Sequence, residues 1–115
     1  AEEAFIAEQR AMQRTVTIVQ KYFYLMGAKI ESVRTVDPSF EIWRKSVVDI
    51  RVSANGNVLS VRTIESSGDS SYDQAVEAAV YKASPLPMPS MELDANANNQ
   101  LREIEFEVKH PNARR

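Results

Sequence analysis

The run from Ser66 to Pro89 constrains this chain most, because a turn, a helix and a helix-blocking exit follow one another directly. Ser66-Ser67-Gly68-Asp69 combines residues that favour turns and helix caps. The next segment has apolar residues at helical spacing on one face: Tyr72, Ala75, Val76, Ala79, Val80 and Ala83. Three prolines then exclude regular structure: Pro85, Pro87 and Pro89. Nothing in this run requires a catalytic group, so it favours an interaction domain over an enzyme.

Composition excludes several classes of function. The 115 residues have room for a single domain, and the absence of cysteine excludes disulfides and thiol chemistry. A net charge of −2 argues against nucleic-acid binding, which needs clustered cations. No apolar run approaches the roughly 18 residues of a membrane span. The chain begins with Ala1, and we expect it to be a processed or excised piece of a longer protein.

Glu2 to Met26 is predicted to form one long helix that stops at Gly27. Its apolar residues make a single stripe: Phe5, Met12, Val16, Val19, Phe23 and Met26. The stripe suits a helix packed on the domain core, and it also suits the end of a coiled-coil stalk. We therefore divide the chain into residues 1–26, the stalk end and first helix, and residues 27–115, the globular domain.

A hairpin is predicted next. Lys45 to Ser53 alternates apolar and polar residues, Asn55-Gly56 is a strong turn signal, and Val58 to Glu65 returns as a second strand. The second strand fits strict alternation poorly, which predicts a bulge or burial of both faces. We expect Trp43, just before the first strand, to be a partly buried anchor.

The second predicted helix runs from Ser70 to Lys82, capped either by Asp69 or by a capping box of Ser70 and Asp73. Met91 to Asn99 is predicted to be a polar loop, and Gln100–Lys109 the last strand. One face of that strand is expected to pack on the helices, and the other, with Leu101 and the glutamates, to be solvated.

The order of elements predicts an α+β fold, a two-layer sandwich. Its three-stranded antiparallel or mixed sheet has the order second, first, third, and the helices cover one face. The strand Gln100–Lys109 is then an edge with unpaired backbone groups. Such an edge binds other chains by strand addition.

These residues resemble a known family, the C-terminal domain shared by the TolA and TonB envelope proteins. The resemblance covers about Val47 to Val108 and is carried by the hairpin, Ser66-Ser67-Gly68-Asp69, the alanine-rich helix and the proline-rich exit. The Ala- and Glu-rich opening favours the TolA branch. The chain departs from the pattern in the extra segment Ala28–Glu41, and it lacks the cysteines of a disulfide that some TolA domains carry.

The resemblance implies a non-catalytic, energy-transducing role in the periplasm, in a parent protein anchored in the inner membrane. It implies the N-terminal segment of TolB as partner, and Pal as a further one, in support of outer-membrane integrity and cell division. Filamentous phage coat protein and colicins are implied as hijackers. The alternative within the family is a TonB-type domain that energises outer-membrane transporters. No cofactor, metal or nucleic acid is expected, and the isolated domain is expected to be a monomer.

The candidate partner-binding residues lie along the last strand, with one from the second helix: Leu101, Glu103, Ile104, Glu105, Phe106, Glu107, Val108 and Tyr72. Backbone hydrogen bonds would give affinity, and pockets beside Ile104, Phe106 and Tyr72 would give selectivity. For each apolar side chain, a purely structural role in the core is at least as good an interpretation.

Two other functions compete with partner binding. One is a serine hydrolase with Ser70 as nucleophile, His110 as base and Glu107 to orient the imidazole. Against it, Asp69 and Ser70 already serve as capping residues. The other is an oligomerisation module at the end of a stalk, formed through the first helix.

Overall fold

Three helices and three strands form the chain in the computed structural model, which describes residues 2–113: α1 (Glu2–Val33), β1 (Lys45–Val52), β2 (Val58–Glu65), α2 (Ser70–Lys82), α3 (Met91–Gln100) and β3 (Glu103–Lys109). The strands form one sheet with the order β2-β1-β3, and both neighbouring pairs are antiparallel. The fold is therefore the predicted α+β sandwich with the predicted strand order.

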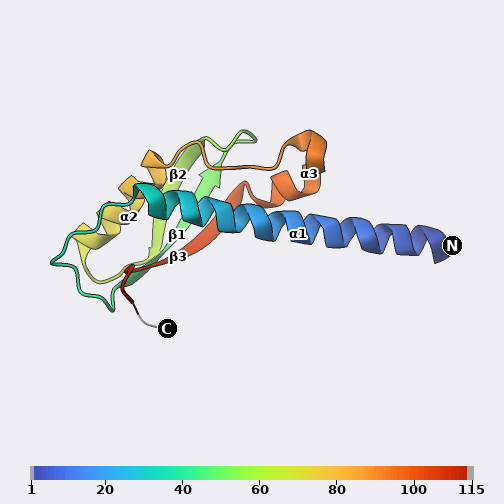
Figure 1. The fold of residues 1–115 in the computed structure, drawn as a ribbon. Coiled ribbons are helices and arrows are strands. Elements are labelled where there is room, and N and C mark those ends of the chain that lie inside the picture. Colours follow the sequence, from blue (N-terminus) through green and yellow to red (C-terminus); the bar gives the residue numbers. More distant parts are fainter. Residues whose placement is uncertain (1, 114–115) are drawn as a thin grey trace.

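Alternation along β1 and β3 separates a buried face from a solvated one. Val48, Ile50 and Val52 of β1 are buried, and on β3 Ile104, Phe106 and Val108 lie across from β1 on the same face. The C-terminal half of α1 crosses the sheet, as Figure 1 shows, and α2 packs on the same core. The opposite face carries the glutamates of β3 and stays open to solvent.

The first helix is longer than predicted, because it passes through Gly27 and ends at Val33. A Cβ atom placed on Gly27 would lie 3.4 Å from Cε1 of Phe106, an ordinary van der Waals contact, so the helix runs close to the sheet here. Met26 and Ile30 are buried on the same stretch. Their burial outweighs the cost of a glycine inside a helix, which is about 1 kcal/mol.

The expected loop Met91–Asn99 is wrong, because these residues form the helix α3 with a kink at Asp94. The Ser90 side chain caps it by accepting a hydrogen bond from the Leu93 N–H at 3.0 Å. The buried Asn98 amide donates to the carbonyls of Ala54 and Pro89, at 2.9 and 2.8 Å. These long-range bonds hold α3 in place, and local propensity does not reveal them.

Smaller differences concern caps and ends. Asp69, and not the Ser70 box, caps α2 by accepting from the N–H groups of Ser71 and Tyr72. The hairpin turn uses a positive φ at Gly56, of 90°. The predicted bulge is confirmed, since the β1–β2 register shifts at both ends of the pairing. Trp43 is 63% exposed, and its ring lies under the Arg44 guanidinium, so it is less buried than expected.

The N-terminal half of α1 extends beyond the sheet (Figure 1), and the molecule measures 60 × 29 × 22 Å. Residues 2–10 are all exposed. The helix is tied to the rest of the fold from Thr15 onward, where the hydroxyl donates to a carboxylate oxygen of Asp94 at 2.7 Å.

Candidate functional site: the open edge of strand β3

The pairing between β1 and β3 determines which backbone groups of β3 face outward. The Val52 N–H donates to the Arg102 carbonyl at 2.9 Å, and the His110 N–H donates to the Arg44 carbonyl at 3.2 Å. The register between these two bonds is unbroken. Because antiparallel strands alternate between hydrogen-bonded and non-bonded pairs, residues 104, 106 and 108 bond to β1. Glu103, Glu105 and Glu107 therefore point their N–H and C=O groups away from the sheet.

The far end of this edge is closed by a side chain. The Lys109 carbonyl, which faces outward by the same alternation, accepts a hydrogen bond from Nη1 of Arg34 at 2.6 Å. Arg34 is itself held by Glu31 at 3.2 Å and by the Tyr72 hydroxyl at 2.9 Å. The unoccupied ladder thus runs from Glu103 to Glu107.

Tyr72 anchors the inner side of this end of the strand. Its hydroxyl lies 3.0 Å from the Val108 carbonyl and 3.2 Å from the Arg44 carbonyl, as donor, and it accepts from Arg34. Burial raises the pKa of the Tyr72 phenol, and the nearby Arg34 charge opposes that rise. The phenol is consequently a structural donor that stays protonated at neutral pH.

The other edge of the sheet, β2, is protected. The Val61 N–H donates to the Tyr81 hydroxyl at 3.2 Å, and the Val58 N–H donates to the Ser84 hydroxyl at 3.0 Å. The register shifts on this side also break the regular ladder. Of the two edges, β3 is the one with a regular row of available backbone groups.

The predicted site residues separate into two groups. The glutamates are exposed on the open face: Glu103, Glu105 and Glu107. The apolar members and the tyrosine are core residues: Leu101, Ile104, Phe106, Val108 and Tyr72. Leu101 does not belong to the strand as expected; it caps the end of α3 and is 1% exposed. The core side chains fix β3 in the sheet, and the backbone of β3 is the part that a partner could contact.

Arg34 and the protected β2 edge were missed by sequence reasoning. Arg34 lies in the segment whose pattern predicts no element, and its partner is a backbone carbonyl 75 residues away. Its place just past the end of α1 at Val33 gave no signal, because the sequence predicts that this helix stops at Gly27.

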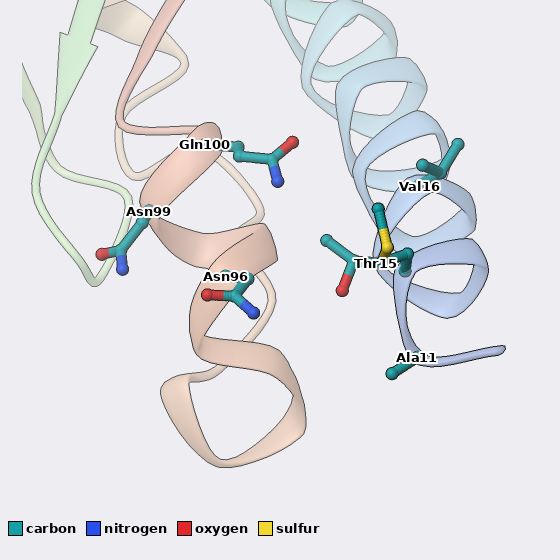
Figure 2. A pocket seen from close by; sticks show the side chains of 7 residues that line it. Ala11, Thr15, Val16, Asn96, Asn99 and Gln100 are labelled. Carbon is teal, nitrogen blue, oxygen red and sulfur yellow. The ribbon is translucent and has the colours of Figure 1, made fainter. Parts of the chain in front are cut away.

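A second surface feature is a groove of about 380 Å³ between α1 and α3. Met12 and Val16 line it from α1, and Asn96 and Gln100 line it from α3. Figure 2 shows the Gln100 side chain pointing from α3 toward α1, whereas the Asn99 side chain points to the other side of α3. The groove is open and carries no charged side chain.

The hydrolase arrangement has little geometric support. Ser70 opens α2 next to the cap Asp69, and Nδ1 of His110 accepts a hydrogen bond from the Asn112 N–H at 3.1 Å. Among residues 2–113, no group of three His, Asp or Glu side chains is placed to hold a metal ion. Within the same residues, no helix is long and apolar enough to cross a membrane.

Comparison with known proteins bears on the family and the fold of the chain. No curated protein matches the chain. A solved structure, the solution NMR structure of TolAIII bound to a peptide derived from the N-terminus of TolB, matches with a TM-score of 0.61 and 23% identity, covering 74% of this chain and 70% of that one. The family described as TonB C terminal matches residues 19–107, well over half of the chain. The chain therefore belongs to the TonB C-terminal family of protein-interaction domains.

Proposed function

We propose that this domain binds an extended segment of a partner protein along the open edge of β3, and that it performs no catalysis. The observation that carries the proposal is the outward row of N–H and C=O groups at Glu103, Glu105 and Glu107. On the opposite edge of the sheet, the amides of Val58 and Val61 in β2 are already bonded to side chains. An added strand gains main-chain hydrogen bonds from such a row.

The partner we propose is the N-terminal segment of TolB. The support is a structural neighbour of the same fold, TolAIII, which was solved with a peptide of that origin. The parent protein would then act in the periplasm, anchored in the inner membrane, and transmit proton-motive energy to outer-membrane partners. Pal, phage coat protein and colicins are further proposed partners that rest on the family alone.

Proline at position 107 tests the edge directly. Glu107→Pro removes an outward N–H without removing a β1–β3 bond, and prolines are tolerated at such edge positions. Glu107→Gln is the matched control, since it loses the same charge and keeps the N–H. We expect Glu107→Pro to weaken binding of a TolB N-terminal peptide at least tenfold relative to Glu107→Gln, measured by calorimetry.

The location of binding is read from amide chemical shifts. The shifts of Glu103, Glu105 and Glu107 should change most on titration, and their hydrogen exchange should slow. Shifts centred on β2 or on the groove between α1 and α3 would reject the β3 edge, as would equal affinities of the two variants.

A second candidate function is oligomerisation through α1. It is favoured by the exposed apolar residues Phe5, Met12 and Val16 on the part of the helix that extends past the sheet. Sedimentation of the domain separates the two readings: a monomer favours partner binding, and a stable dimer or trimer favours the helix as an assembly surface.

A further inference from the structure

The open face of the sheet contains a charge arrangement that extends to the β3 edge. Glu105 lies directly across from Asp49 of β1, and both side chains project to the open face. This is a non-hydrogen-bonded pair by the alternation derived above, the type in which side chains approach most closely. Like charges in direct opposition destabilise a sheet.

The charges of the two neighbouring glutamates are paired with cations, and the charge of Glu105 is not. Glu103 pairs with Arg51 at 3.2 Å, and Glu107 pairs with Lys109 at 3.4 Å. On its other side Asp49 lies opposite Arg62 of β2. Glu105 makes no ion pair within 4 Å among residues 2–113. Asp49 makes no such ion pair among these residues either, although Arg62 lies opposite it, so the opposed pair is unmatched and Glu105 is its member at the open ladder.

A guest strand would place its own residues beside this charge. The residues opposite Glu103, Glu105 and Glu107 share the open face with them, whether the guest runs parallel or antiparallel, because side chains alternate with period two. A cation opposite Glu105 would complete the row Arg62, Asp49, Glu105 and relieve the repulsion.

The other side of a guest strand would face an apolar surface. Phe23 of α1 stacks on Phe106 with ring centroids 4.2 Å apart and an interplanar angle of 8°. Phe23 is 39% exposed, and Phe106 is 8% exposed. Alternate guest residues that turn toward the helices would therefore pack best if they were apolar.

We infer that the segment accepted by this edge alternates Lys or Arg with apolar residues, and that Glu105 is the residue that selects the cation. The inference rests on the proposed strand addition and adds the chemistry of the guest to it. The backbone row supplies the site, and the Asp49–Glu105 opposition supplies the preference.

Three synthetic peptides of seven residues test the preference. One alternates lysine with valine, one glutamate with valine, and one threonine with valine. With the wild-type domain at low salt, we expect the lysine peptide to bind about tenfold more tightly than the glutamate peptide, with threonine between them. The difference should shrink as salt rises, because these charges are solvent-exposed.

Charge reversal assigns the preference to one residue. Glu105→Lys should reverse the order of the lysine and glutamate peptides. The control Glu65→Lys makes the same change on β2, at the protected border of the sheet, and should leave the order unchanged. Amide shifts at Glu103 and Glu107 verify in each case that the peptide lies along β3.

The outcomes separate this inference from the proposed function. If all three peptides shift the β3 amides with equal affinity, the charge preference is wrong and strand addition stands. The same holds if the lysine preference survives Glu105→Lys. If no peptide, including the TolB segment, shifts the β3 amides, both are overturned.

Discussion

At the scale of single residues, Tyr72 helps to hold β3 in position. Its hydroxyl connects the Val108 carbonyl, the Arg44 carbonyl and the Arg34 guanidinium in a buried site. Tyr72→Phe should lower the free energy of unfolding by about 1–3 kcal/mol, because it leaves buried polar groups without a partner. Urea unfolding measures this, and Tyr24→Phe, at a side chain 74% exposed, is the control. Equal losses in the two variants would contradict the account.

A second residue-scale prediction concerns acid. The Asp73 carboxylate accepts hydrogen bonds from the Ser66 hydroxyl and the Ser67 N–H. Burial acts to raise the pKa of this carboxyl, but the hydrogen bonds from Ser66 and Ser67 outweigh it, and the pKa lies below its usual value of 3.8. A lowered folded-state pKa stabilises the fold above pH 3.8, and that contribution is lost as the pH falls through the folded value.

Asp73→Asn should therefore be less stable than wild type at pH 7, and the difference in unfolding free energy should narrow in strong acid. Chemical denaturation at pH 7, 4 and 2.5 measures the trend. Glu77→Gln, one turn along α2, serves for comparison. The Glu77 carboxylate also accepts a hydrogen bond from a hydroxyl, that of Thr63, at 2.5 Å. A difference for Asp73→Asn that stays constant or widens on acidification would refute the assignment.

At the scale of elements, two glycines make a contrasting pair. A Cβ on Gly56, at a φ of 90°, would lie 2.0 Å from the Leu86 carbonyl oxygen, whereas a Cβ on Gly27 meets only Phe106 at 3.4 Å. Gly56→Ala should cost about 2 kcal/mol or more, because the hairpin and the proline segment must separate. Gly27→Ala should be neutral or stabilising by up to about 1 kcal/mol, since alanine favours the helix. Thermal unfolding of both variants checks the contrast, and similar shifts in Tm would count against it.

Some of the elements could be predicted from the sequence, and others could not. The hairpin, α2 and the alternation of β3 were predicted because each has a local code of turn residues, caps or spacing. The helix α3 was missed because the buried amide of Asn98 holds it from far along the chain. The outward direction of the Glu103, Glu105 and Glu107 backbone was not predictable, since alternation of side chains does not say which residues of a strand form its hydrogen-bonded pairs. That information came from the β1–β3 register.

At the scale of the whole molecule, α1 has an exposed N-terminal part and a part that packs on the rest of the fold. Residues 2–10 are exposed and extend beyond the sheet, whereas the helix is tied to α3 at Thr15 and to the core at Met26 and Ile30. A chain beginning at Ala11 should keep the full free energy of unfolding to within about 0.5 kcal/mol. A chain beginning at Val19 should lose a few kcal/mol of unfolding free energy, because it lacks the Thr15–Asp94 hydrogen bond and the part of α1 that packs on α3. Equal losses would show that the exposed part supports the fold.

The difference between the two sheet edges limits how copies of this domain associate. Tyr81 and Ser84 occupy amides of β2, so a strand that joins at β3 finds no continuation on the far side of the sheet. Two domains that met edge to edge would also bring identical rows of glutamate together. Growth of a fibre by strand pairing needs a free sheet edge on both sides of every domain. This domain offers one, so an added strand terminates the sheet and does not seed a polymer.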